Sequence, residues 1–73
     1  MTADETKRTL STIMDLIHDR LQAASEISKA AKACAEVGSL DEAIRITLAI
    51  DGPLYEATTL SNAAALIKRL AEE

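Results

Sequence analysis

A chain of 73 residues with 48% apolar residues, a single aromatic side chain and a net charge of −4 forms at most one domain, residues 1–73. The acidic balance argues against nucleic acid as a partner. One cysteine excludes an internal disulfide framework, and one histidine with scattered carboxylates does not make a zinc site. We therefore expect no metal and no cofactor.

The sequence contains no catalytic motif, and its only aromatic residue is Tyr55, whereas ligand pockets are usually lined by several aromatic side chains. We therefore predict a protein that is not an enzyme. No run of about 18 apolar residues occurs, and the first residues lack the apolar core of a signal peptide. These features predict a cytoplasmic protein without a membrane partner.

The first expected helix covers residues 3–37. Thr2 and Glu5 have the spacing of a capping box at its start. Its apolar residues follow a heptad, with one row at Leu10, Ile17, Ala24 and Ala31 and a second row at Met14, Leu21, Ser28 and Ala35. We expect both rows to line one seam against a second helix, with Leu21 buried in it.

The apolar stripe of this helix is wider than one partner helix can cover. Ile13, Ile27 and Cys34 extend it on one flank, and Leu16 and Val37 widen it further. Cys34 is expected to pack as a small hydrophobe. The surplus apolar residues predict a second contact surface, so Ile13, Leu16, Ile27 and Val37 are candidate interface residues.

The first interruption of the helical pattern is Gly38-Ser39. After it, Ser39 and Glu42 repeat the capping-box spacing and predict a second helix over residues 40–51.

The second interruption is Gly52-Pro53, and a third helix is expected over residues 53–71. Proline suits the first position of a helix, but it cannot donate to the carbonyl of Ala49. The sequence therefore predicts a bend here, with Tyr55 displayed just past it. Tyr55 is the fifth candidate interface residue, and a role in capping the apolar end of the bundle is the alternative.

The helix lengths indicate an all-α hairpin with a long first helix and a second arm broken into two helices. At about 1.5 Å per residue the first helix spans roughly 50 Å, and the other two placed end to end span about 46 Å. A compact three-helix bundle is the alternative, and it requires the chain to reverse at Gly52-Pro53. Two hairpins would pair into a dimeric four-helix-bundle-like assembly that covers the remaining apolar stripe.

The one histidine, His18, lies in the run Leu16-Ile17-His18-Asp19-Arg20-Leu21. This run resembles the phospho-acceptor box of sensor histidine kinases, in which an acidic residue follows the histidine on a helix of a dimeric bundle. The resemblance implies that His18 accepts a phosphoryl group. The Asn or Pro that follows in those kinases is missing, as is an ATP-binding domain.

The combined pattern favours a small interaction or regulatory module, such as an antiactivator, an adaptor or a small chaperone. Its expected partners are a second copy of itself and another protein. Two alternatives come from other classes: a histidine phosphotransfer protein that uses His18, and a small dimeric RNA-binding hairpin.

Overall fold

The computed structural model describes residues 2–73, and in this part of the chain every regular element is helical. Helix α1 spans Ala3–Glu36, α2 spans Leu40–Thr47, and α3 spans Asp51–Ala71. A 3₁₀ segment, Leu48–Ile50, joins α2 to α3. None of the helices described is both long and apolar enough to cross a bilayer.

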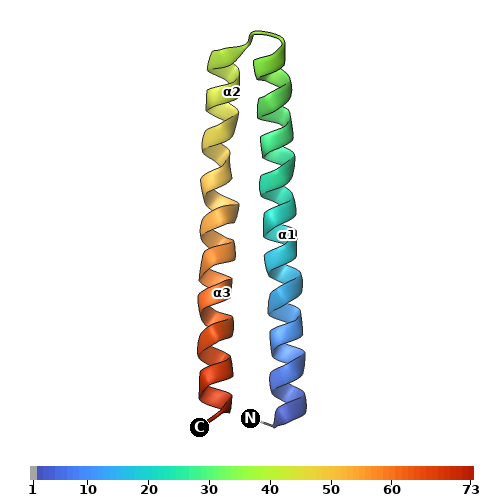
Figure 1. Ribbon diagram of the computed structural model, residues 1–73, viewed down its shortest axis with the longest axis vertical. Helices are drawn as coiled ribbons and strands as arrows, with labels where there is room; N and C mark the ends of the chain where they lie inside the picture. Colours follow the sequence, from blue (N-terminus) through green and yellow to red (C-terminus); the bar gives the residue numbers. More distant parts are fainter. Residues whose placement is uncertain (1) are drawn as a thin grey trace.

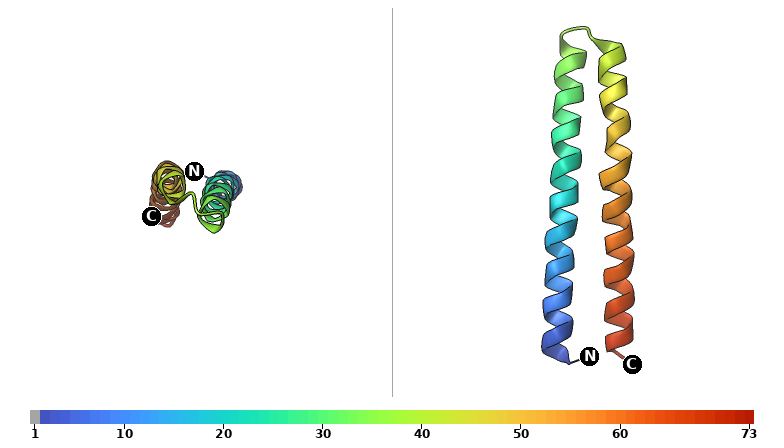
Figure 2. Two further views of the ribbon diagram at one scale, coloured as in Figure 1. Left: turned by 90° about the horizontal axis from the view of Figure 1, so that it is seen from above. Right: turned by 180° about the vertical axis from the view of Figure 1, so that it is seen from behind.

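The chain folds as a hairpin of two antiparallel arms, which confirms the hairpin prediction (Figure 1). The first arm is α1 and the second is α2 followed by α3, and both α2 and α3 pack against α1. The two described chain ends lie together at the end opposite the turn (Figure 2). The compact three-helix bundle is wrong, because the molecule measures 54 × 15 × 11 Å and is only one helix pair thick.

A threonine cap begins α1. Thr2 is extended, with φ −73° and ψ 162°, and its hydroxyl oxygen accepts a hydrogen bond from the backbone N–H of Glu5 at 3.1 Å. The side chain thus satisfies one of the N–H groups that have no partner inside the helix. This interaction confirms the predicted helix start.

A left-handed glycine ends α1. Gly38 has φ +84°, its N–H donates to the carbonyl of Ala35 at 3.0 Å, and the N–H of Ser39 donates to the carbonyl of Cys34 at 2.9 Å. This pair of bonds is the Schellman motif, which satisfies the last carbonyls of a helix. The second predicted capping box does not form: Ser39 has ψ 65°, not an extended backbone, and its side chain makes no capping bond.

The second arm does not turn away at Gly52-Pro53, so the predicted bend is wrong (Figure 1). Helix α3 begins at Asp51, which puts Pro53 in its first turn, where an N–H has no partner inside the helix. Gly52 lacks the Cβ that clashes with a following proline in a helical backbone. The local irregularity is the 3₁₀ segment Leu48–Ile50, whose flanking residues all keep helical angles.

The core is a seam between the arms, formed by residues at alternating steps of four and three. On α1 these residues are Thr6, Leu10, Ile13, Ile17, Arg20, Ala24, Ile27, Ala31 and Cys34. On the second arm they are Ala43, Ile46, Ile50, Pro53, Ala57, Leu60, Ala64 and Ile67. The buried members are Ile13 and five alanines. The second arm therefore keeps one heptad register through Gly52-Pro53.

Only one of the two heptad rows expected in the seam is there. The Leu10 row faces the second arm, but Met14 and Leu21 are 52% and 47% exposed, so their row lies beside the seam. The row of Ile13 and Ile27 takes its place. That row contains the polar residues Thr6 and Arg20, and the Met14 row contains Lys7 and Ser28, so the pattern of α1 alone does not choose between the two rows.

Replacing Gly38 with alanine should destabilise the protein by about 1–2 kcal/mol, because an L-residue with a Cβ is strained in the left-handed conformation. Thermal unfolding at a fixed protein concentration measures this, and about 1 kcal/mol corresponds to a shift of roughly 4–8 °C for a chain of this size. The matched control is Gly38→Asn, which should lose less because asparagine tolerates this conformation. Equal losses in the two variants would contradict the assigned role of Gly38.

Candidate interaction surface

Large apolar side chains cover much of the surface. More than 40% of the residue surface is exposed for Met14, Leu16, Leu21, Val37, Leu40, Ile44, Leu48, Leu54, Tyr55, Leu66 and Leu70. Among the described residues no large side chain is completely buried. The hairpin therefore exposes more large apolar side chains than it hides, which is the pattern of an interaction surface.

The first group of these residues forms what we call the Leu21 face. Side chains four positions after the Leu10 row of α1 and the Ala43 row of the second arm lie on the same side of the seam. The apolar members at these positions are Met14, Leu21, Ala35, Leu40 and Leu54, and we add Ile44, which lies one turn after Leu40 and lines the same groove. Two grooves on this face confirm the grouping, because each is lined by residues of both arms.

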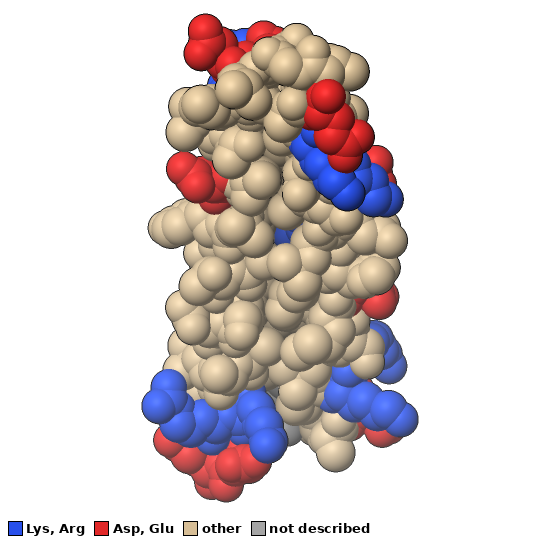
Figure 3. Space-filling view, turned by 45° about the horizontal axis from the view of Figure 1, so that its top comes forward, with Lys and Arg blue, Asp and Glu red and all other residues tan. Residues whose placement is uncertain are grey.

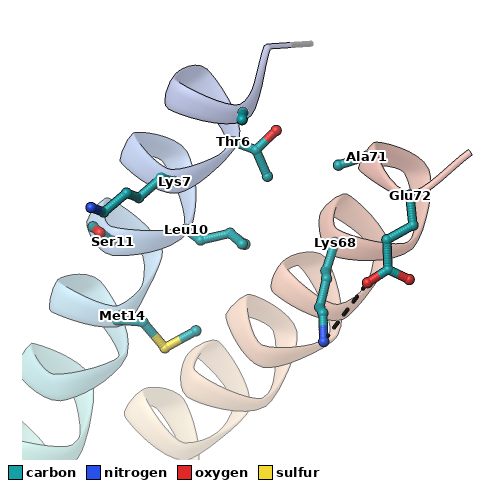
Figure 4. A pocket seen from close by; sticks show the side chains of 9 residues that line it. Thr6, Lys7, Leu10, Ser11, Met14, Lys68, Ala71 and Glu72 are labelled. Carbon is teal, nitrogen blue, oxygen red and sulfur yellow. Dashed lines mark ion pairs between the residues drawn. The ribbon is translucent and has the colours of Figure 1, made fainter.

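The groove at the open end of the hairpin has a volume of about 570 Å³. Leu10 and Met14 of α1 point toward α3, while Lys7 points away from it (Figure 4). On the α3 side Lys68 forms an ion pair with Glu72, with Nζ and Oε1 3.8 Å apart. The groove is thus apolar between the arms and charged at its rim.

The groove near the turn has a volume of about 480 Å³ and the same character. Ala31 and Ala43 form its floor, and Leu40 and Ile44 stand at its edge with 60% and 63% of their surface exposed. Small residues in the seam leave this space open, since alanine side chains do not reach across it.

The opposite side, which we call the Leu16 face, combines apolar and charged residues. Its apolar members are Leu16, Ala23, Ala30, Val37, Ala63, Leu66 and Leu70. Its charged members include Asp19, Glu26, Glu42, Arg45 and Glu56. This face is therefore less suited to complete burial, because charged groups are costly to remove from water.

A pair of ionised residues links the arms at mid-length. Arg20 lies in the seam, and its guanidinium approaches the carboxylate of Glu56 at 3.5 Å. Their side chains are 39% and 54% exposed, and the Nε atom of Arg20 is buried without a hydrogen-bond partner. A groove of about 400 Å³ beside them is lined by Leu16, Tyr55 and Leu60. This pair is a weak contributor to stability, as exposed ion pairs generally are.

Replacing Arg20 with leucine should raise stability by about 1 kcal/mol, because it fills a seam position with an apolar side chain and removes the unpartnered Nε. Thermal unfolding at fixed concentration tests this. Glu56→Ala is the comparison variant, and its effect should stay within about 1 kcal/mol because the pair is exposed. A clear loss of stability in Arg20→Leu would show that the ion pair, not apolar contact, holds the arms together at this level.

The remaining ion pairs lie on the outside of the helices and involve neighbours in sequence. Arg45 donates to Glu42 from Nε at 3.1 Å and from a second nitrogen, and this hydrogen bond holds the pKa of the Glu42 carboxyl below its usual value. Lys29 and Lys32 pair with Glu26 and Glu36 respectively. These contacts balance charge along the outer sides of the helices.

His18 is exposed on α1, on the same side of the hairpin as Leu21. Exposure meets one requirement of a phospho-acceptor, but phosphotransfer by His18 stays a hypothesis. Cys34 lies half-buried in the seam as a free thiol, in agreement with its predicted packing role. No three metal-ligating side chains of residues 2–73 come together.

The five candidate interface residues divide into two groups. Ile13 is buried and Ile27 is half-buried in the seam, so both are used inside the hairpin and the surplus flank to which they were assigned is wrong. Leu16, Val37 and Tyr55 are exposed, Val37 and Tyr55 at 79% and 74%. Their role in binding stays a prediction.

Apart from Tyr55, the sequence analysis did not identify the exposed apolar side chains of the second arm as candidate interface residues. Leu40, Ile44 and Leu54 lie on the Leu21 face and Leu66 on the Leu16 face. The signal was available: these residues fall outside the row that starts at Ala43, which continues unbroken past Pro53. The expectation of a bend hid this continuity.

Comparison with protein families, with curated proteins and with solved structures finds no match for this chain. The geometry of its surface is therefore the basis for assigning a function.

Proposed function

We propose that the protein is a non-enzymatic interaction module that acts as a homo-oligomer and, in that form, binds and regulates or scaffolds another protein. An antiactivator, an adaptor and a small chaperone are roles of this kind. The proposal requires a surface that is incomplete in the isolated chain, and it requires no reactive group.

The total exposed area carries this proposal. The isolated hairpin exposes 5432 Å². A folded monomer of 7.8 kDa is expected to expose about 4,400 Å². The excess of roughly 1,000 Å² is close to the 800 Å² that each partner buries in a standard protein interface. The excess area is therefore of the size that one partner covers.

The composition of the seam supports the same conclusion. Five of the six buried residues described in it are alanines, and the sixth is Ile13. Burial of a methyl group removes little apolar area from water, whereas every ordered residue costs conformational entropy. A chain of this length usually needs disulfides, a metal, an oligomeric partner or very regular helix packing to fold stably. One cysteine cannot form an internal disulfide, and a seam rich in alanine buries little apolar area, which favours an oligomeric partner.

Light scattering behind size exclusion at about 10 μM protein tests the proposal. We expect a mass of at least twice the 7.8 kDa of one chain, with a helical circular-dichroism spectrum measured on the same fraction. A single-chain mass with full helicity would overturn the proposal, because it would show that the hairpin needs no second surface.

A further inference from the structure

We propose that two hairpins pack antiparallel through their Leu21 faces, so that Leu40 and Ile44 of each copy fill the open-end groove of the other. The inference rests on the proposed function and names both the partner and the surface. It goes further by fixing which face is covered and which ends of the two copies meet.

The distribution of charge selects the face. The view in Figure 3 shows the Leu21 side, on which most acidic and basic residues gather at the two ends and the margins, and only a small basic patch is visible between the arms in the middle. That middle contains Met14, Leu21 and Leu54 together with uncharged polar residues, and His18 and Asp51 lie at its margins. The Leu16 face carries the ion pair of Glu56 and Arg20 at the same level. Burying the Leu21 face therefore removes apolar surface from water and desolvates less charge near the middle than burying the Leu16 face.

The size of the face fits a second copy of the chain. The hairpin is 54 Å long and 15 Å wide, so one flat side offers on the order of 800 Å², the area that one partner contributes to a standard interface. A second hairpin is the occupant with the same length and the same apolar band. Two hairpins face to face also form a four-helix bundle, in which each arm packs on two neighbours.

The positions of Leu40, Ile44 and the open-end groove along the hairpin decide whether two copies run parallel or antiparallel. Leu21 and Leu54 lie near the middle of the two arms. At about 1.5 Å per residue, Leu40 is roughly 21 Å from Leu54 toward the turn. The open-end groove lies between Leu10 and Ala71, which are about 17 Å and 26 Å from this middle in the other direction. A two-fold axis through the middle of the face therefore places the protruding pair of one copy in the groove of the other.

The lysines at the open end also favour an antiparallel pair. Lys7 and Lys68 line the open-end groove, and the one carboxylate among the described residues that line it, Glu72, pairs with Lys68, so the groove keeps an excess of positive charge. In a parallel pair the two copies would bring four ammonium groups together at one end of the bundle. In the antiparallel pair the two sets are separated by most of the 54 Å length, far beyond the screening length of about 8 Å at physiological salt.

A matched pair of substitutions tests the face. Leu21 and Leu66 are 47% and 46% exposed on opposite sides of the hairpin. Light scattering at about 10 μM should give a single-chain mass for Leu21→Glu and a two-chain mass for Leu66→Glu. The opposite result, or a two-chain mass for both, would overturn the Leu21 face as the interface while leaving self-association intact.

A spin label attached to Ser39→Cys in a Cys34→Ala background tests whether the two hairpins run antiparallel. Neither substitution changes an apolar residue of the Leu21 face. Ser39 lies in the turn and its side chain makes no capping bond. Pulsed electron resonance should give a label separation of about 50 Å, near the 54 Å length of the hairpin. A separation of about 20 Å, the width of two helix layers, would indicate a parallel pair and overturn the inference. Absence of any pair distance would contradict the proposed function itself.

Discussion

The close approach of two helices over alanine is the interaction on which the rest of this structure depends. Ala24, Ala31, Ala43, Ala57 and Ala64 are buried between the arms. Their small side chains let the backbones approach and hold α1 straight against the second arm for its whole length. The same feature limits the stability of the isolated hairpin, because a methyl group buries little apolar area. Isoleucine and leucine side chains fill the other seam positions, and the remaining large apolar residues stay on the surface.

Two local devices keep the alanines in register. The left-handed Gly38 ends α1 and reverses the chain within a few residues, so the heptad of the second arm starts opposite the end of the first. Pro53 lies in the first turn of α3, where its missing N–H removes no helical bond. The second arm therefore behaves as one rod, and the exposed apolar residues of both arms keep their places beside the seam along the hairpin.

Local chemistry made most of the fold predictable. The Thr2 cap, the turn at Gly38 and the hairpin itself follow from capping, left-handed glycine and helix length. The face of α1 was not predictable from its own pattern, because Ile13 and Leu21 belong to equally apolar rows and only the second arm decides between them. Whether the second arm bends at Pro53 depends on where α3 begins, and its start at Asp51 was not evident from the sequence. The exposed residues of the second arm became visible only once its heptad was known to be continuous.

We infer that the alanine seam alone does not hold the fold and that a second surface completes it. Dependence of the thermal midpoint on protein concentration tests this claim directly, because the stability of a protein that folds with its partner rises with concentration by mass action. Between about 1 and 100 μM the account predicts a midpoint that rises by several degrees. A midpoint that stays constant over this range would contradict it.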